Sequence, residues 1–433
     1  MVIVPDALSA LVRKGEFVPR YYNPGELFDE VHVVMTNDDK ANAADVQMTV
    51  GRARLYLHNI PIDRWLFTKT LGYRNFLLNH WAAKGVELVS EIKPDLVRCY
   101  GISFNSYLAA RIKQKTGTPF VVSLHGNPDL DLRGPVATTL RAKLYAQAYK
   151  AVESPALKYA DHFIAVYASV VPYLQKHRVQ NFSLIYNAVG YSAIQKTDYQ
   201  LQKPLARFLC VGRQQSLFKD PTNIVKAIAE LPEAELIMIG TGDLHERLKS
   251  LAQTLRCDTR CRFIPALPNE QVLAAMREAD IYVFNQISLG ISKTIIEAAL
   301  TGLPIIVNAR PVGAKDELSG EWLSRAEDSK DGYLAAMKTL LHDKSERERL
   351  GRAAYSYART FWAPENLENQ VVEVYRQIMR DGHGESGNAN WTRRNGLRGQ
   401  RPPKSHRLAD LLEHNDTQAR ERDYTNANAI REL

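Results

Sequence analysis

The sequence has few of the features that mark secreted, membrane-spanning or metal-bound proteins. Cysteine is scarce, with four in 433 residues, which is too few for a disulfide scaffold. Cys257 and Cys261 lack a nearby histidine cluster, so reduced thiols are favoured over a zinc site. No apolar run of about 18 residues or more occurs, and the first residues do not resemble a signal peptide. We therefore expect a cytoplasmic protein that has no transmembrane helix and binds no metal.

Length and composition are those of an ordinary globular protein. Hydrophobic residues make up 45% of the chain and charged residues 24%, which excludes a collagen-like, coiled-coil or wholly disordered protein. At roughly 150 residues per domain, the chain is long enough for two or three domains with sizeable cores.

The net charge of +8 is concentrated in the N-terminal half. Residues 1–200 hold 23 Lys and Arg against 17 Asp and Glu, and seven basic residues lie between Arg111 and Lys150. Such a face can contact an anionic membrane or a phosphorylated substrate, or it can be merely solvated. Nucleic acid is the least favoured partner, because no nucleic-acid-binding motif accompanies the charge. We expect a weak contact with the inner face of a membrane, as in a peripheral protein.

The C-terminal half alternates short apolar runs with amphipathic segments, a pattern typical of βαβ units and a parallel sheet. Helical patterns cover 222–230, 244–255 and 270–279. The predicted strands are Phe208–Gly212, Leu236–Gly240, Arg262–Ile264, Ile281–Phe284 and Leu303–Val307.

The N-terminal half shows the same alternation less regularly. Helices are expected over 107–115 and 136–151. The predicted strands are Val2–Val4, Val31–Met35, Leu96–Tyr100, Phe120–Leu124, Phe163–Val166 and Ser183–Ile185. The whole chain is therefore expected to be α/β, with an N-terminal domain over 1–200, a second domain over 201–360, a helical segment over 361–380 and a disordered tail over 381–433.

Three motifs point weakly to other ligands. Gly240-Thr-Gly242 begins like a dinucleotide fingerprint, but His245 occupies the third glycine position. Ser292-Lys293-Thr294 ends like a P-loop, yet no glycine precedes the lysine. Asp129-Leu-Asp131 could chelate a cation, although a lone pair of this kind is usually solvated. We reject an NAD site and an ATPase site on these grounds.

A better constellation follows the first strand of the second half. Gly212 and Arg213 end that strand and Lys219 follows shortly after, so the turn can present two cations to a diphosphate at the carboxyl edge of the sheet. Further on, Leu289–Thr294 forms a loop before a helix, whose N-terminus can bind an anion. Glu297 lies within that helix.

These residues resemble family 4 retaining glycosyltransferases, which have the GT-B architecture of two Rossmann-like domains facing each other across a cleft. The resemblance covers about 208–379. It is carried by Arg213, Lys219, Gly240, Gly242, Ala279-Asp280-Ile281 and Glu297–Pro304. Three further segments resemble the family's His-Gly loop, its Asn-Gly-Val segment and the segment that crosses back to the first domain: Ser123–Gly126, Tyr186–Val189 and Phe361–Met379.

The resemblance implies a role for each matching position. Arg213 and Lys219 would hold the donor diphosphate, Glu297 would bind the nucleotide ribose, and His125 would reach the sugar from the acceptor domain. Backbone amides at Gly290, Ile291 and Ser292 would contact the phosphate and the sugar. The remaining residues expected to line the donor site are Gly212, Gly240, Gly242 and Thr294.

The sequence departs from the family pattern in several places. Leu289 replaces the first acid of the Glu-x7-Glu motif, and Pro5 and Asp6 stand where a glycine-rich loop usually follows the first strand. We expect a sugar transferred from a nucleotide-diphosphate donor to a glycan or lipid-linked acceptor, without a cofactor. A nucleotide-sugar epimerase of the same fold and a non-catalytic sugar-nucleotide-binding scaffold remain open alternatives.

The composition of the segment after Arg380 generates a first prediction. The segment is rich in Gly, Asn, Arg and Pro and has too little apolar surface to offset its ordering entropy. A chain that ends at Arg380 should therefore keep its melting temperature within about 2 °C of the full chain, measured by calorimetry. A larger decrease would mean that the segment packs on the folded body.

Overall fold

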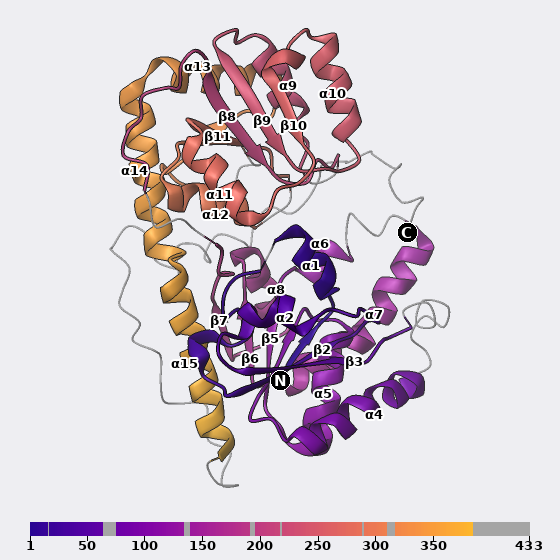
Figure 1. The fold of residues 1–433 in the computed structure, drawn as a ribbon. Helices are drawn as coiled ribbons and strands as arrows, with labels where there is room; N and C mark the ends of the chain where they lie inside the picture. Colours follow the sequence, from indigo (N-terminus) through magenta and orange to yellow (C-terminus); the bar gives the residue numbers. More distant parts are fainter. Residues whose placement is uncertain are drawn as a thin grey trace.

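Two parallel β-sheets, each covered by helices, form the computed structural model of this protein (Figure 1). The structure describes residues 1–15, 17–63, 75–133, 139–190, 195–216, 219–287, 290–309 and 317–383. The expected α/β class with two Rossmann-like units is confirmed. The predicted disordered tail lies outside the described residues, except for its first residues, which belong to a helix that ends at His383.

The N-terminal sheet has seven strands in the order β3-β2-β1-β4-β5-β6-β7, all of them parallel. Its central strands are buried on both faces, which explains their continuous apolar runs. The strands are β1 (Val2–Val4), β2 (Glu30–Met35), β3 (Arg54–Asn59), β4 (Val97–Tyr100), β5 (Phe120–Leu124), β6 (His162–Ala165) and β7 (Phe182–Leu184). The α-helices around it are α1 (Leu8–Lys14), α2 (Ala43–Val46), α4 (Asn75–Ile92), α5 (Phe104–Thr116), α6 (Pro128–Asp131), α7 (Leu140–Tyr159) and α8 (Val171–Lys176).

The C-terminal sheet has six parallel strands in the order β10-β9-β8-β11-β12-β13. The strands are β8 (Ala206–Val211), β9 (Ala234–Ile239), β10 (Cys261–Ile264), β11 (Ile281–Phe284), β12 (Ile305–Asn308) and β13 (Ser324–Ala326). Its helices are α9 (Thr222–Ala229), α10 (His245–Thr254), α11 (Asn269–Glu278), α12 (Lys293–Thr301), α13 (Lys330–His342) and α14 (Lys344–Phe361). One large apolar core joins the strands to these helices.

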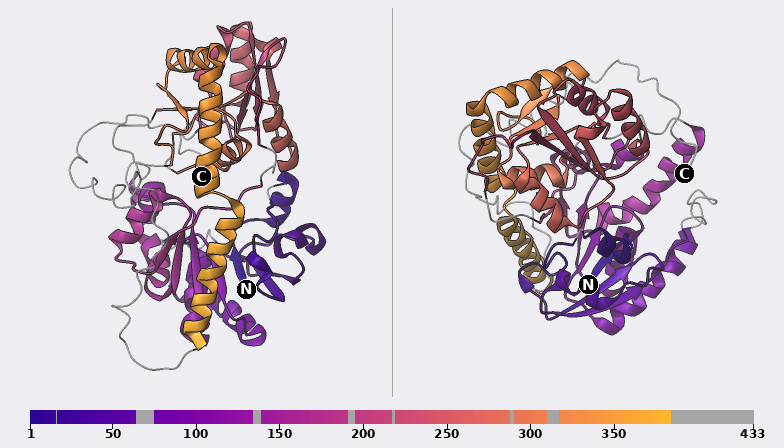
Figure 2. Two further views of the ribbon diagram at one scale, coloured as in Figure 1. Left: turned by 90° about the vertical axis from the view of Figure 1, so that its left-hand side faces the viewer. Right: turned by 45° about the horizontal axis from the view of Figure 1, so that its top comes forward.

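Helix α15 (Pro364–His383) leaves the C-terminal domain and runs along the N-terminal one, as the orange-to-yellow helix in Figures 1 and 2 shows. Its apolar face packs on one side of the N-terminal sheet. Leu367, Val371 and Tyr375 of this helix share a core with Val121 and Ile164 of strands β5 and β6. The last described helix therefore completes the core of the first domain.

The predicted strands and helices are found, with differences at some ends. Strands β3 and β13 were not predicted from the sequence. Strand β3 lies at the sheet edge, so its residues alternate between partly buried and exposed instead of forming an apolar run. The end predicted for the helix over 136–151 is wrong. Helix α7 continues through Pro155 to Tyr159. In the described ranges, no helix has the length and apolar character needed to cross a bilayer.

Candidate functional site

The turns after β8 and β9 are packed against each other through glycines. A Cβ atom on Gly240 would lie 2.0 Å from the Gly212 carbonyl oxygen, and one on Gly242 would lie 2.0 Å from the Gln214 carbonyl oxygen. Gly240 also has a φ of 134°, which side chains rarely adopt. These glycines are therefore required for the close approach of the two turns, whatever they bind.

Arg213 and Lys219 lie on the turn that follows β8. Gln215 and Lys219 exchange backbone hydrogen bonds of 3.0 and 2.9 Å, which bends the chain back on itself. The Lys219 ammonium lies 5.4 Å from the centre of the Phe284 ring. Burial and the Arg213 charge lower the pKa of Lys219. Neither cation forms an ion pair with a carboxylate of the described residues, so the turn is electropositive.

Gln286 holds the loop before α12 in place through hydrogen bonds. Gln286 donates to the Gly290 carbonyl oxygen at 2.8 Å and accepts from the Ser292 amide at 3.0 Å. The Ser292 amide is thus occupied in this arrangement, although the sequence analysis expected it to meet the donor. Ile291 is buried beside it. Gln286 could not be identified from the sequence, because its role depends on contacts outside any motif.

The first turn of α12 is tied to the end of β8. The Thr294 hydroxyl donates to the Val211 carbonyl oxygen at 2.9 Å, and Tyr282 donates to Thr294 at 2.8 Å. The helix N-terminus therefore lies next to the turn of Gly212. This arrangement brings the two cations and the helix end to one edge of the sheet.

Glu297 is buried within α12, with 4% of its surface exposed. Asn269, the first residue of α11, donates to its carboxylate at 2.9 Å. A Cβ atom on Gly190 would lie 2.4 Å from the Asn269 side-chain oxygen, so the interdomain linker passes close to this pair. Glu297 could be proposed from the sequence, whereas Asn269 could not, because it is distant in the sequence.

His125 follows β5 and belongs to the other domain. Burial, together with the charges of Lys293 and Arg98, lowers its pKa to about 3, so the ring is neutral at ordinary pH. The Asn187 side-chain amide lies 3.4 Å from His125 Nδ1 and can donate to it, which leaves the ring proton on Nε2. That Nε2 is buried and has no hydrogen-bond partner among the described residues.

The two domains meet beside His125. The charge of Lys293, the first residue of α12, contributes to the lowered pKa of His125, which belongs to the N-terminal domain. A Cβ atom on Gly290 would lie 3.2 Å from the Tyr167 ring. Glu317 accepts from the Ala168 amide at 2.6 Å and is buried. The structure thus brings the Gly290 loop and His125 to one junction, and it adds Lys293 to the predicted residues.

Of the acidic pair near His125, Asp129 is paired with cationic side chains. Asp129 accepts hydrogen bonds from Arg133 at 2.8 Å and from Lys176 at 2.7 Å. No group of three or more His, Cys, Asp or Glu side chains that could hold a metal occurs in the described part of the chain.

Two family models match adjacent parts of the chain. The model described as Glycosyltransferase Family 4 matches residues 26–191, and the model described as Glycosyl transferases group 1 matches residues 193–357. Together they cover both sheets, except for strand β1, and the residues of the site between them.

Curated relatives align over part of the chain. A D-inositol 3-phosphate glycosyltransferase of Corynebacterium efficiens is 32% identical over 39% of this chain and 42% of its own length. The sulfoquinovosyl transferase SQD2 of Arabidopsis thaliana is 27% identical over 37% of this chain and 31% of its own length. The alignments therefore span less than half of either relative.

Solved structures match over most of the chain at low identity, which shows the fold alone. HepE of Anabaena, solved in complex with UDP, has a TM-score of 0.62 at 15% identity and covers 87% of this chain and 99% of its own. Sucrose-phosphate synthase of Thermosynechococcus elongatus has a TM-score of 0.65 at 15% identity, with 88% and 99% covered. The two sheets have the GT-B arrangement, and the chain belongs to the family 4 glycosyltransferases of group 1.

Proposed function

We propose that this protein transfers a sugar from a nucleotide-diphosphate donor to a glycan or lipid-linked acceptor, with retention of configuration and without a metal ion. The observation that carries the proposal is the pair of cations, Arg213 and Lys219, next to the N-terminus of α12. A diphosphate complements such a pair, because it can accept hydrogen bonds from both cations and from the helix end. Its charge would also favour the protonated form of Lys219, whose pKa is lowered by burial and by the charge of Arg213.

The reaction would need stabilisation of one growing negative charge. As the bond between the sugar C1 and the phosphate oxygen breaks, charge develops on the leaving diphosphate, and fixed cations and N–H dipoles stabilise it. The acceptor hydroxyl would form its bond to C1 on the same face. Its proton would pass to an oxygen of the leaving phosphate, so no protein base is needed.

Other residues would position the donor. The Glu297 carboxylate, held by Asn269, would accept hydrogen bonds from the ribose. The Nε2–H of neutral His125 would donate to a hydroxyl of the sugar from across the junction. Lys293 would add positive charge on the same side. Because HepE was solved with UDP and with UDP-glucose, a UDP-sugar is the first donor to test.

Two alternative functions are compatible with the same fold. A non-catalytic sugar-nucleotide-binding protein is motivated by Leu289, which lies outside the described residues. An epimerase of the same fold is motivated by a proposed UDP-N-acetylglucosamine 2-epimerase of Listeria monocytogenes, with a TM-score of 0.57 at 13% identity. A thermal-shift screen with UDP-, GDP- and ADP-sugars would identify the donor, and analysis of the products would separate transfer from epimerisation.

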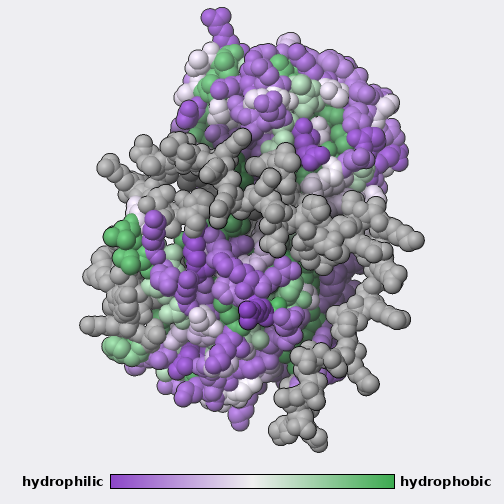
Figure 3. All heavy atoms as spheres, turned by 180° about the vertical axis from the view of Figure 1, so that it is seen from behind, coloured by the Kyte–Doolittle hydropathy of each residue, from purple (hydrophilic) through white to green (hydrophobic). Residues whose placement is uncertain are grey.

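A peripheral contact with anionic membranes is part of the proposal. Helix α7 begins with Leu140 and Leu144, which are 75% and 44% exposed, and also carries Lys143 and Lys150. An apolar patch is visible over the start of this helix at the left edge of the molecule in Figure 3. Exposed leucines next to lysines suit the interface of an anionic bilayer. Arg133 precedes α7 in the same basic region and pairs with Asp129 and Glu153. Its charge is therefore not available to contact a membrane.

Substitutions in the cation pair test the donor site. Arg213→Ala or Lys219→Ala should lower turnover roughly 100-fold or more, because the lost contact strengthens as charge grows on the leaving group. Glu297→Gln should weaken donor binding roughly 10-fold, since a hydrogen bond to a charged group contributes about 1.5–3 kcal/mol. Calorimetry with the best donor and steady-state kinetics measure both effects.

Arg247→Ala is the matched control, because Arg247 is an exposed arginine of the same domain on α10. It should leave donor binding unchanged, and all variants should melt close to the parent. If all three site variants bind the donor as tightly as the parent, the donor site is assigned wrongly.

The neutral state of His125 generates a prediction about pH. The folded pKa is about 3, whereas an unfolded histidine titrates near ~6.5. Below ~6.5 the unfolded chain therefore binds a proton that the folded chain does not, and stability falls by about 1.4 kcal/mol per pH unit from this group. His125→Gln should make the decrease between about pH 6 and pH 4 shallower by up to that amount.

Urea unfolding at several pH values measures this difference. His342→Gln, at an exposed histidine on α13, is the control and should keep the slope of the parent. An unchanged slope in His125→Gln would mean that His125 is protonated in the folded protein.

Membrane contact is tested by liposome flotation of the full chain. The parent should float with anionic vesicles and less so with neutral vesicles or at high salt. Leu140→Glu with Leu144→Glu should abolish flotation, because these changes place two carboxylates at the anionic surface. Met48→Glu, at an exposed methionine before β3, is the control. Equal recovery from neutral and anionic vesicles would contradict the proposed contact.

A further inference from the structure

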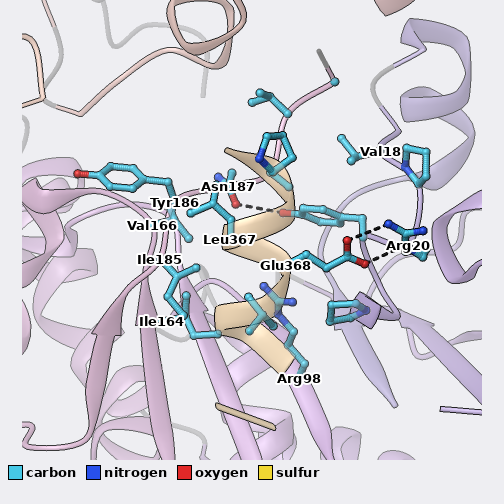
Figure 4. Close-up of a pocket in the computed structure, with 18 residues that line it drawn as sticks. Val18, Arg20, Arg98, Ile164, Val166, Ile185, Tyr186, Asn187, Leu367 and Glu368 are labelled. Atoms are coloured by element: carbon cyan, nitrogen blue, oxygen red, sulfur yellow. Dashed lines mark hydrogen bonds and ion pairs between the residues drawn. The ribbon is translucent and has the colours of Figure 1, made fainter. Parts of the chain in front are cut away.

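A pocket lies between helix α15 and the N-terminal sheet, next to the linker that joins the domains (Figure 4). Its volume is about 300 Å³. Its walls come from the loop 18–24, the linker 185–190 and the start of α15, and the side chain of Arg98 lines it as well. None of the residues assigned above to the donor site lines this pocket.

Arg98 is the unusual feature of the pocket. It belongs to β4, is 6% exposed, and donates from Nε to the Ser123 hydroxyl and from Nη1 to the Tyr375 hydroxyl, both at 2.9 Å. Its guanidinium also lies 4.7 Å from the centre of the Tyr100 ring. No carboxylate pairs with it, and its Nη2 donates no hydrogen bond, among the residues that the structure describes.

Two other arginines show what a satisfied guanidinium looks like in this protein. Arg347, equally buried, donates to the carbonyl oxygens of Tyr199, Leu340 and Leu341. Arg20, which also lines the pocket, forms two hydrogen bonds to the Glu368 carboxylate, at 2.8 and 2.9 Å. Arg98 differs from both, because its only partners among the described residues are neutral hydroxyl groups and aromatic rings.

A buried charge without a counter-ion is unfavourable, and a charged ligand can relieve it. The remaining N–H groups of Arg98 are suited to a carboxylate or a phosphate, which accept hydrogen bonds from a guanidinium in a fixed geometry. Most of the other walls are apolar. They include Ile164, Val166, Ile185, Leu367 and Val371. The two other charged residues of the lining, Arg20 and Glu368, pair with each other. A mostly apolar pocket with one charge that lacks a counter-ion suits a small organic ligand.

We infer that this pocket binds a small organic anion, a carboxylate or a phosphate monoester, whose charged group pairs with Arg98 and whose short apolar body contacts the walls from α15 and β6. The pocket shares none of the residues assigned to the donor, although it adjoins the junction through Asn187, which lines it and lies 3.4 Å from His125 Nδ1. Because its walls come from the N-terminal domain, the linker and the returning helix, an occupant would hold these three parts together. The inference does not depend on the proposed activity.

Calorimetry on the full chain, without any donor, tests it with four probes. Hexanoate and hexyl phosphate carry both the charge and the apolar body, whereas hexan-1-ol and inorganic phosphate each carry one of them. At least one of the two hexyl anions should bind roughly 10-fold or more tightly than either hexan-1-ol or inorganic phosphate, because both parts of the pocket are then used. Which of the two binds better identifies the anionic group.

Two variants locate the binding. Arg98→Met removes the charge and should lower the affinity for the better hexyl anion about 10-fold or more. Ala188→Phe leaves Arg98 in place and fills the pocket from the linker, so it tests the site even if Arg98→Met fails to fold. Arg178→Met, at an exposed arginine of the same domain, is the matched control and should bind as the parent does.

The inference is overturned if hexan-1-ol binds as tightly as both anions, or if neither anion binds. It is also overturned if Ala188→Phe folds and binds the anion as the parent does. A UDP-sugar should bind with unchanged affinity in the presence of the anion. Competition between the two would place the anion in the donor site instead.

Discussion

The parallel direction of every strand in both sheets is the constraint on which the site depends. Parallel strands all end at the same edge, so the turns that follow them gather there. His125 follows β5, Gly212 follows β8, Gly240 follows β9, and the Gly290 loop comes after β11. The contact between Gly290 and Tyr167 shows that the two carboxyl edges face each other. Residues far apart in the sequence therefore meet at one junction.

The positive charge at this junction comes from cations that lack a carboxylate partner among the described residues. Arg213 and Lys219 have no carboxylate beside them among the described residues, whereas many surface arginines of the same protein are paired. Burial, and then the charges of Lys293 and Arg98, lower the pKa of His125 and keep it neutral. A site built in this way has an excess of positive charge and a neutral hydrogen-bond donor, which suits an anionic ligand with a hydroxylated part.

The sequence was sufficient to predict the fold class and most strands, because buried parallel strands leave apolar runs such as Phe120–Leu124. It was insufficient for β3, although Leu55 and Leu57 alternate with polar residues there and carry a weak strand signal. Strand β13 has three residues and leaves no such signal.

The candidate site shows a similar division. Arg213, Lys219 and Glu297 were proposed from the sequence because they match motifs of the family that the chain resembles, and their roles stay predictions. Gln286 and Asn269 could not be proposed in this way, since they act through hydrogen bonds to a loop and a helix that only the folded chain brings close.

The return of α15 to the first domain has a consequence for synthesis on the ribosome. Strands β5 and β6 are made before the second domain, but the apolar residues that cover one of their faces, such as Leu367 and Tyr375, are made after it. While the second domain is being translated, that face of the first sheet is uncovered and exposes apolar surface to water or to a chaperone. The N-terminal domain can reach its final core only after the second domain has been synthesised.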